Sequence, residues 1–276
     1  MSHPDSDRVA AARTLLFVPG DRPDRFAKAA SSGADLVVID LEDAVAPGDK
    51  EAARDNAAAW LALGHRAVVR VNPPGTPWFE ADLARAADHG CTLMVPKAEE
   101  PAVLTEIATR TAGRCPLIPL VETALGIERA PEVCAVPGVV RAAFGNVDLA
   151  AQLGVAPDDH TALTYARSRL VLASAAAGTH PPVDGVTTAV RDPDALRTDT
   201  AHARSLGFTG KLCIHPAQVR PVSDEFAPTP GELRWARRVL DAGDSVTAID
   251  GQMVDRPVLE RARAVLARAG EPRTAP

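Results

Sequence analysis

Eight short apolar segments alternate with more polar stretches along most of this chain, and this alternation restricts its fold more than any other feature. The segments are rich in Val, Ile and Leu, and the stretches between them have helical spacing, which is typical of repeated strand–helix units. The predicted strands are Thr14–Val18, Asp35–Asp40, Ala67–Val71, Thr92–Val95, Leu117–Val121, Val140–Phe144, Val183–Val186 and Lys211–Ile214. The clearest predicted helices are Lys50–Leu63, Trp78–His89, Pro101–Ala112, Thr161–Ala177 and Pro193–Leu206.

Eight such units predict a closed parallel (β/α)8 barrel of the TIM type, for which 276 residues are sufficient. We place the catalytic barrel at residues 9–222. A doubly wound open sheet is the alternative, but no predicted strand is followed by the glycine fingerprint G-x-G-x-x-G. The chain is therefore expected to form a barrel.

Beyond the eighth strand, Thr229–Ala242 and Arg256–Ala269 predict two further amphipathic helices. Residues 223–270 are thus expected to form a C-terminal helical extension that belongs to the same unit, where added helices often cover the site or form a subunit contact. The tails Met1–Arg8 and Glu271–Pro276 are expected to be disordered.

Composition excludes several classes of protein. A net charge of −6 and a pI near 5.7 argue against nucleic acid as the main partner. The four cysteines are far apart and form no C-x-x-C pair, so neither a disulfide framework nor a zinc site is expected. The N-terminus lacks a signal-peptide core and no apolar run is long enough to span a bilayer, which predicts a soluble, cytoplasmic protein without a membrane partner.

Polar residues follow seven of the predicted strands. Because the carboxyl ends of barrel strands surround the active site, these side chains are expected to converge on one cavity. They are Asp40, Glu42 and Asp43 after the second strand, Arg70 and Asn72 at the third, Lys97 at the fourth, Glu122 at the fifth, Asn146 and Asp148 after the sixth, Asp184 at the seventh and His215 at the eighth.

Two of these residues, Glu122 and Asp148, end neighbouring strands and place two carboxylates side by side. Two such anions repel each other unless they share a proton or a cation. Oxygen ligands without nearby His or Cys favour Mg²⁺, with Mn²⁺ as a substitute. The alternative is that one carboxylate pairs with Lys97 or Arg70 instead.

The first strand–helix turn carries three cations at the spacing of one helical face: Arg22, Arg25 and Lys28. Such a cluster at the mouth of a barrel could hold phosphate groups. Composition alone favours an ordinary solvated face, so the phosphate interpretation needs support from other parts of the chain.

Taken in order, the strand-end motifs resemble the citrate lyase β-subunit-like branch of the malyl-CoA lyase and HpcH/HpaI aldolase superfamily. The resemblance covers nearly the whole chain. The matching stretches are Leu15–Arg22, Asp40–Val45, Val69–Pro73, Val95–Lys97, Glu122–Thr123, Phe144–Asp148, Asp184–Gly185, Lys211–Pro216 and Met253–Asp255.

The resemblance implies a magnesium-dependent carbon–carbon lyase of the oxo-acid-lyase type. Its substrate would be a 3-hydroxyacyl-CoA such as malyl-, methylmalyl- or citramalyl-CoA, and its products acetyl- or propionyl-CoA and a 2-oxo acid. The resemblance also implies a homotrimer or a dimer of trimers, in which the C-terminal extension closes over the barrel of the next subunit.

The resemblance assigns roles to individual residues, position by position. Glu122 and Asp148 match the metal ligands, Arg70 matches the arginine that contacts the substrate carbonyl, and Asp255 matches an acidic residue contributed by a neighbouring subunit. The resemblance also places Phe17, Arg22 and Lys28 in the segment that holds coenzyme A. We further expect Gly145, Asn146 and Val147 to bind substrate, and Asp40, Glu42 and Asp43 to orient Arg70 or metal-bound water.

Other functions use the same residues. Water could attack the thioester, which would make the protein a malyl-CoA thioesterase. A citrate lyase β subunit would instead act on a citryl thioester held by an acyl-carrier protein. Lys97 could serve as the Schiff-base nucleophile of a metal-independent aldolase. A non-catalytic ligand-binding barrel is the fourth alternative.

Overall fold

The computed structural model describes residues 4–241, 247–249 and 252–270. It contains two compact units, Met1–Glu225 and Phe226–Pro276. Within the described residues, no helix is long and apolar enough to cross a membrane.

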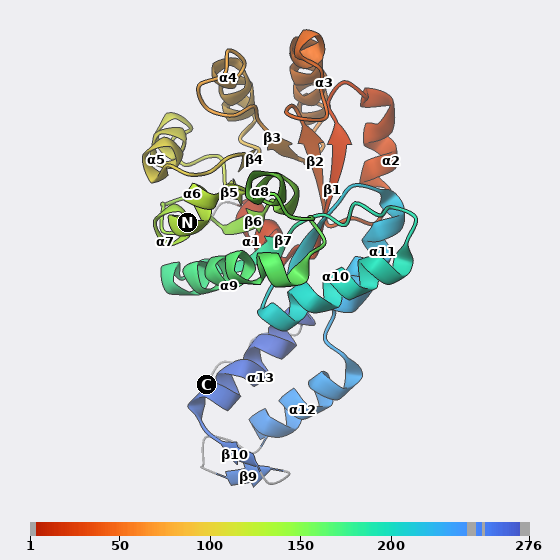
Figure 1. Cartoon of the computed structure of the whole chain (residues 1–276), viewed down its shortest axis with the longest axis vertical. Helices are drawn as coiled ribbons and strands as arrows, with labels where there is room; N and C mark the ends of the chain where they lie inside the picture. The colour runs from red at the N-terminus through yellow and green to blue at the C-terminus, as the bar shows by residue number, and fades with distance from the viewer. Residues whose placement is uncertain (1–3, 242–246, 250–251, 271–276) are drawn as a thin grey trace. The chain divides into compact units, whose positions relative to one another are not determined.

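The first unit contains a closed barrel of parallel strands whose order around the barrel follows their order in the sequence (Figure 1). The predicted (β/α)8 fold is confirmed. The strands are β1 (Thr14–Pro19), β2 (Leu36–Asp40), β3 (Val68–Arg70), β4 (Thr92–Val95), β5 (Leu117–Val121), β6 (Arg141–Phe144), β7 (His180–Asp184) and β8 (Gly210–Cys213).

Helices surround this barrel, as Figure 1 shows. The longer ones match the predicted ranges to within about two residues at each end, the usual uncertainty of helix boundaries. They are α3 (Lys50–Ala62), α4 (Phe79–His89), α5 (Pro101–Arg110), α9 (His160–Ala177) and α10 (Pro193–Leu206). A further long helix, α11 (Pro216–Phe226), follows β8 and lies outside the predicted ranges. Short helices occupy the remaining connections: η1 (Pro23–Arg25), α2 (Phe26–Ala30), η2 (Pro47–Asp49), α6 (Ala124–Glu128), α7 (Ala130–Cys134) and α8 (Asn146–Leu153).

The seventh strand begins three residues earlier than its apolar pattern predicts. The two prolines near its start, Pro181 and Pro182, interrupt the pattern of apolar residues typical of strands. Prolines lack an N–H donor and are uncommon inside sheets. Here their carbonyl groups are used instead: the carbonyl of Pro182 accepts from Thr209 N, and the Arg141 side chain donates to both proline carbonyls. The strand therefore keeps hydrogen-bonded neighbours without the missing donors.

The N-terminal segment is helical from Pro4 to Ala11 (α1), so the prediction of a disordered Met1–Arg8 is wrong for the described residues from Pro4 onward. Val9 and Ala12 are buried in the same apolar cluster as strand residues Leu15 and Val183. The polar composition of the segment concealed this packing, because only two of its apolar side chains are buried in the barrel.

Arg141, at the start of β6, fixes α1 to the barrel. Its fully buried guanidinium donates hydrogen bonds to the carbonyls of Val9, Ala10 and Ala12 at the C-terminal end of α1, where a cation is favoured by the helix dipole. It also donates to the Pro181 and Pro182 carbonyls and to the Thr209 hydroxyl, which makes six hydrogen bonds in all.

The second unit is built on two helices, α12 (Pro230–Asp241) and α13 (Arg256–Arg268), with a two-stranded antiparallel ribbon, β9 (Thr247–Ile249) and β10 (Gln252–Val254). Its own apolar cluster is made by Ala236, Val239, Leu259, Ala262 and Val265. Both helices were predicted from their spacing, whereas the three-residue strands are too short to give a periodic signal.

We predict that Arg141→Met greatly destabilises the first unit. The substitution leaves several buried carbonyl groups without a donor, so the free energy of unfolding is expected to fall by about 3–5 kcal/mol. Urea denaturation followed by circular dichroism measures this change. Arg197→Met is the control, because exposed Arg197 pairs with exposed Asp194. Its loss should cost less than about 1 kcal/mol. Equal losses for the two variants would contradict the anchoring role.

Candidate active site

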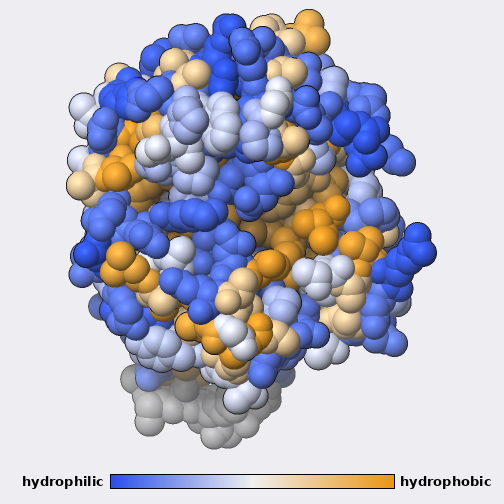
Figure 2. Space-filling model, turned by 45° about the horizontal axis from the view of Figure 1, so that its top comes forward, coloured by the Kyte–Doolittle hydropathy of each residue, from blue (hydrophilic) through white to orange (hydrophobic). Residues whose placement is uncertain are grey.

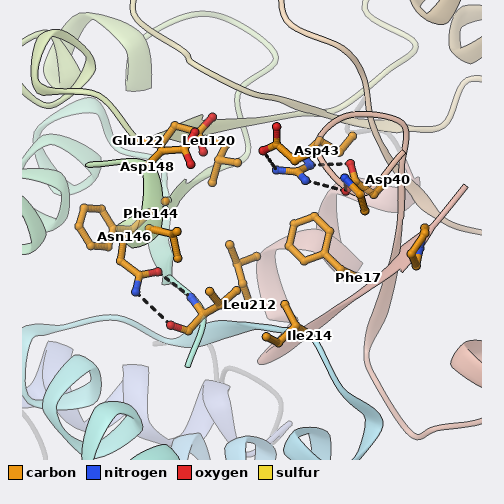
Figure 3. Close-up of a pocket in the computed structure, with 16 residues that line it drawn as sticks. Phe17, Asp40, Asp43, Leu120, Glu122, Phe144, Asn146, Asp148, Leu212 and Ile214 are labelled. Atoms are coloured by element: carbon orange, nitrogen blue, oxygen red, sulfur yellow. Dashed lines mark hydrogen bonds and ion pairs between the residues drawn. The ribbon is translucent and has the colours of Figure 1, made fainter. Parts of the chain in front are cut away.

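A cavity of about 440 Å³ opens among the carboxyl ends of the barrel strands. Figure 2 shows this face hollowed, with hydrophobic and hydrophilic surface on different sides of the hollow, and Figure 3 shows the lining residues. Charged side chains (Asp40, Asp43, Arg70, Glu122 and Asp148) line one part of the cavity, and apolar ones (Phe17, Leu120, Val186, Leu212 and Ile214) line another. The cavity can therefore hold a ligand with one polar and one apolar part.

The charged part is built around the pair Asp40–Arg70, which joins the ends of the neighbouring strands β2 and β3. Arg70 Nε and Nη2 donate to the two oxygens of Asp40 at 2.7 and 2.6 Å, a bidentate arrangement. Asp40 also accepts from the backbone N–H groups of Glu42 and Ala44. This fixes the guanidinium in one orientation, with its Cζ 4.9 Å from the centre of the Phe17 ring.

Glu42 and Asp43 follow β2 and face the third guanidinium nitrogen. Arg70 Nη1 lies 3.0 Å from Glu42 Oε2 and 3.7 Å from Asp43 Oδ2. Glu42 Oε2 is buried and is not aligned for a hydrogen bond, so its contact with Arg70 is purely ionic. Glu42 is almost fully buried, whereas the Asp43 side chain is 60% exposed. Asp43 is therefore the one that solvent or a ligand can reach.

Glu122 and Asp148 come from neighbouring strand ends, as predicted. Glu122 is buried directly after β5, and Asp148 lies in the first turn of α8 after β6. Gly145 makes room for them: a Cβ at this position would lie 2.4 Å from Glu122 Cβ and 2.6 Å from Glu122 Oε2. A side chain at residue 145 would therefore displace the Glu122 carboxylate.

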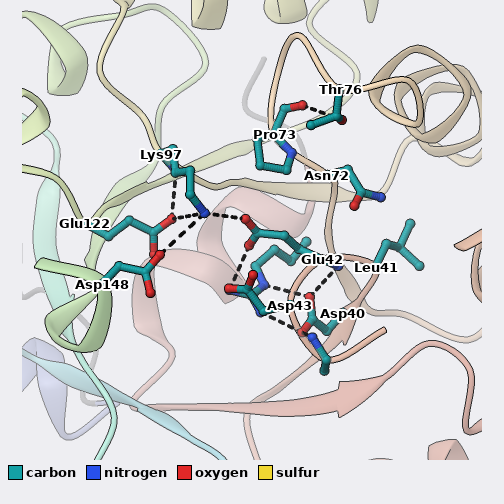
Figure 4. A network of polar contacts seen from close by, with 12 residues as sticks. Asp40, Leu41, Glu42, Asp43, Asn72, Pro73, Thr76, Lys97, Glu122 and Asp148 are labelled. Atoms are coloured by element: carbon teal, nitrogen blue, oxygen red, sulfur yellow. Dashed lines mark hydrogen bonds and ion pairs between the residues drawn. The ribbon is translucent and has the colours of Figure 1, made fainter. Parts of the chain in front are cut away.

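Lys97 lies between the carboxylates (Figure 4). Its Nζ is 2.8 Å from Glu42 Oε1, 3.4 Å from Asp148 Oδ2 and 4.0 Å from Glu122 Oε1. Its backbone N–H donates to Glu122 Oε1 at 2.8 Å. The contact between Lys97 and the carboxylate pair, which the sequence offered as the alternative to a metal, is thus present in the structure.

The electrostatics of the cluster follow from burial. Burial raises the pKa of Glu122 to about 8, and the negative charge of Glu42 adds to this effect. Burial also raises the pKa of Glu42, although Arg70 and Lys97 partly offset it. Burial alone would lower the pKa of Lys97, but its hydrogen bond to Glu42 and the charges of Glu42 and Glu122 raise it. Lys97 is therefore a protonated cation and a poor nucleophile.

Two supporting residues escaped prediction. Lys50 is buried and its Nζ donates to the carbonyls of Leu41 and Glu42, which fixes the loop that carries the acidic residues. Gln218 is buried and accepts from the N–H groups of Ile214 and His215 while donating to the Thr187 carbonyl. Neither residue directly follows a strand, so the rule that active-site residues follow barrel strands does not point to them.

The expected substrate-binding stretch Gly145–Val147 lines the cavity. The Asn146 side chain, however, is engaged with the backbone: its Nδ2 donates to Pro157 O and Val186 O, and its Oδ1 accepts from Val186 N. Asn146 thus holds together the loops after β6 and β7. A contact of its side chain with substrate stays a prediction.

Five of the polar strand-end residues do not line the cavity: Glu42 and Lys97, which pair with each other beside it, and Asp184, Asn72 and His215. Asp184 is fully buried and pairs with Arg167 on α9 and Lys211 on β8. Asn72 donates to Asp82 on α4, and exposed His215 accepts from the N–H of Ala217. The expectation that all seven strand ends contribute polar side chains to one cavity is therefore wrong for the fourth, seventh and eighth strands, whose predicted residues Lys97, Asp184 and His215 lie outside its lining.

The predicted coenzyme A residues are only partly at the cavity. Phe17 lines it, whereas the Arg22 side chain is exposed and bonded to Asp24 through Nε and Nη2. Lys28 is exposed on α2. Asp255 belongs to the second unit, where its side chain accepts from Val258 N and caps α13. Roles of these four residues in catalysis or coenzyme A binding stay predictions.

Within the described residues, no group of three or more His, Cys, Asp or Glu side chains is arranged to hold a metal ion. The candidate ligands in this cavity are the two carboxylates Glu122 and Asp148. Two cations, Arg70 and Lys97, face five acidic side chains here: Asp40, Glu42, Asp43, Glu122 and Asp148. Because acidic groups outnumber basic ones, a further cation would be attracted to the cluster.

Residues 13–216 match the model of the HpcH/HpaI aldolase/citrate lyase family. The chain belongs to this family. Both the family expected from the sequence motifs and the expected enzyme class, a carbon–carbon lyase, are thereby confirmed.

Three curated relatives match over most of their length. A citrate lyase subunit beta-like protein of Mycobacterium tuberculosis is 40% identical, covering 95% of this chain and 97% of the relative. A (3S)-malyl-CoA thioesterase of Cereibacter sphaeroides is 35% identical, covering 93% and 94%. A mitochondrial citramalyl-CoA lyase of Rattus norvegicus is 32% identical, covering 93% and 86%.

A solved structure, that of CitE from Mycobacterium tuberculosis in complex with magnesium, acetoacetate and coenzyme A, is also similar. It matches with a TM-score of 0.81 and 39% identity, covering 95% of this chain and all of that one.

Proposed function

We propose that this protein is a magnesium-dependent acyl-CoA lyase that cleaves a 3-hydroxyacyl-CoA into a shorter acyl-CoA and a 2-oxo acid. The substrate would be of the malyl-, methylmalyl- or citramalyl-CoA type. The observation that carries the proposal is the position of the carboxylate pair Glu122–Asp148 in the same cavity as Arg70, a cation fixed by Asp40. The substrate's carbon–carbon bond breaks between the carbon that carries the hydroxyl and the carbon beside the thioester. In this site the carboxylate pair would serve the hydroxyl end and Arg70 the thioester end.

The residues fit a magnesium ion. Glu122 and Asp148 provide hard oxygen ligands, Gly145 leaves space beside them, and the surrounding cluster has an excess of negative charge. With two protein ligands, the ion would keep further positions for water and substrate. When bound, Mg²⁺ would acidify the substrate hydroxyl and orient the departing oxo acid.

Arg70 accounts for the other half of the reaction. When the bond between C2 and C3 breaks, its electron pair moves through C2 onto the thioester oxygen. The hydroxyl proton passes to water in the cavity, and C3 becomes the carbonyl carbon of the 2-oxo acid. A guanidinium stabilises the resulting enolate more strongly than it stabilises a neutral carbonyl. Because Asp40 already fixes Arg70, little reorganisation is needed.

The remaining residues have supporting parts in this proposal. Asp40, Glu42 and Asp43 orient Arg70 or ordered water, and Gly145, Asn146 and Val147 shape the wall beside the carboxylates. Phe17, Arg22 and Lys28 bind the coenzyme A part of the substrate. The C-terminal extension would close as a lid over a neighbouring barrel in a trimer, with Asp255 protonating the enolate carbon.

Hydrolysis is the second candidate, favoured by the 35% identity to a (3S)-malyl-CoA thioesterase. In that case water attacks the thioester, and the carbon–carbon bond stays intact. A carrier-bound citryl thioester is the corresponding alternative substrate, given the similarity to a citrate lyase subunit beta-like protein.

A product assay tests the proposal. Malyl-, citramalyl- and methylmalyl-CoA are each incubated with the protein, with and without Mg²⁺, and the products are separated by chromatography. We expect an acyl-CoA and a 2-oxo acid only when Mg²⁺ is present, and a loss of at least about 10³-fold in kcat/KM for Asp148→Ala. Free coenzyme A with an intact hydroxy acid would support the thioesterase instead, and full activity of Asp148→Ala would refute the metal site.

Magnesium affinity should depend on pH. Below its pKa of about 8, Glu122 carries a proton that the metal must displace, so binding strengthens as the pH rises and levels off above that value. We expect the apparent Kd to be about tenfold lower at about pH 9 than at about pH 7. Calorimetry in two buffers of different ionisation enthalpy should show proton release at the lower pH. A pH-independent affinity without proton release would contradict this role of Glu122.

The shared-site part of the proposal predicts complementation between two inactive variants. Arg70→Ala and Asp255→Ala subunits are each expected to be inactive alone. After exchange, mixed oligomers contain sites with both residues intact, so part of the activity should return. Exchange is verified by mass spectrometry of differently labelled subunits. Mixed oligomers without activity would show that one chain supplies both residues.

A further inference from the structure

The Lys97 ammonium lies among the side chains proposed to hold the metal. Its Nζ is 3.4 Å from Asp148 Oδ2, 4.0 Å from Glu122 Oε1 and 2.8 Å from Glu42 Oε1. Figure 4 shows the Nζ placed between the carboxylate pair and Glu42. A cation in this position compensates buried negative charge that would otherwise be costly.

The backbone of Lys97 is held in an unfavourable conformation. Its φ of 48° lies in the left-handed region, which only one other non-glycine residue of the described chain adopts. The N–H of Lys97 donates to Glu122 Oε1 in this conformation. Such strain in a residue with a Cβ persists only where the surroundings maintain it, and it is often found at functional sites.

A second cavity adjoins Lys97. It has a volume of about 310 Å³ and is lined by the stem of Lys97 together with Pro73, Pro96, Glu99 and Leu104. The Lys97 side chain is 40% exposed, so the packing around it does not lock its ammonium in place. Within the described part of the chain, the Glu99 carboxylate has neither a hydrogen bond nor an ion pair, whereas neighbouring Glu100 is bonded to Arg129. An alternative anionic partner for Lys97 is thus available in this cavity.

We propose that Lys97 is a built-in cation that occupies the carboxylate cluster in the metal-free protein and withdraws into the adjoining cavity, towards Glu99, when Mg²⁺ binds. The inference rests on the proposed magnesium site. It assigns Lys97 a positioning role rather than the nucleophilic role of a Schiff-base aldolase.

The physical basis is competition between two cations for the same oxygens. An ammonium a few ångströms from a divalent ion repels it strongly in a partly buried site. The same ammonium keeps the carboxylates of Glu42 and Asp148 from repelling each other before the metal arrives. Lys97 therefore stabilises the metal-free fold and lowers the affinity for Mg²⁺. Glu99 makes the loss of affinity smaller, because it gives the displaced ammonium a partner.

Calorimetric titration with Mg²⁺ alone, combined with thermal unfolding without metal, tests the proposal. Lys97→Met keeps the stem and the Cβ but removes the charge. We expect it to bind Mg²⁺ about tenfold more tightly than the wild type and to unfold at a lower temperature when metal-free. Arg85→Met, which removes an exposed cation that contacts Asp55 on the helix layer, is the control for net charge and should change neither quantity appreciably.

A double-mutant cycle separates withdrawal from general electrostatics. Glu99→Gln should weaken Mg²⁺ binding about threefold in the wild type and have no effect in the Lys97→Met background, because Glu99 acts only through Lys97. Glu106→Gln on α5, which removes an exposed carboxylate, is the matched control. If Glu99→Gln has the same effect in both backgrounds, Lys97 does not withdraw towards Glu99 and the proposal is overturned.

The outcomes also distinguish this inference from the proposed function. A wild-type protein that binds no Mg²⁺ at any pH refutes the metal site itself, and the inference falls with it. A wild type that binds Mg²⁺ while Lys97→Met binds no more tightly refutes the role of Lys97 alone. If Lys97→Met does not fold, the Mg²⁺ affinities of Lys97→Gln and Glu99→Gln are measured instead. Lys97→Gln should bind Mg²⁺ more tightly than the wild type and Glu99→Gln more weakly, and an unchanged affinity in either variant refutes the role of Lys97.

Discussion

The bidentate pair between Asp40 and Arg70 is the interaction on which the rest of the site depends. Five carboxylates at one end of a barrel would repel one another, and the arginine at the end of β3 compensates three of them at once. Because Asp40 is itself fixed by two backbone N–H groups, the guanidinium has a defined direction. The same pair thus stabilises the loop after β2 and prepares a cation for a substrate oxygen.

The barrel and the carboxylate pair could be predicted from the sequence because both follow from short-range rules. Alternating strands and helices predict a parallel barrel, and residues after adjacent strands lie close together. Glu122 and Asp148 are such residues. Asp184 satisfies the same rule, yet its side chain is committed to Arg167 and Lys211 between strand and helix. Position after a strand does not reveal the direction in which a side chain points.

Other features depend on partners far away in the chain. The segment that forms α1 is polar, so its sequence predicts disorder. The residue that fixes it, Arg141, lies about 130 residues further along the chain. Lys50 and Gln218 act on backbone carbonyls and N–H groups, which leave no trace in the pattern of side chains. The left-handed backbone of Lys97 is likewise invisible in sequence, because lysine has no preference for that conformation.

The six hydrogen bonds of Arg141 also have a consequence for the order in which a ribosome-bound chain can fold. The helix α1 is synthesised before the barrel strands, but the acceptors that share its arginine, Pro182 and Thr209, emerge only when most of the barrel has been made. Until then the terminal turn of α1 and the guanidinium have incomplete partners. The helix α1 is therefore fixed late although it is made early, and closure of the barrel and docking of α1 are expected to be a single late event during synthesis.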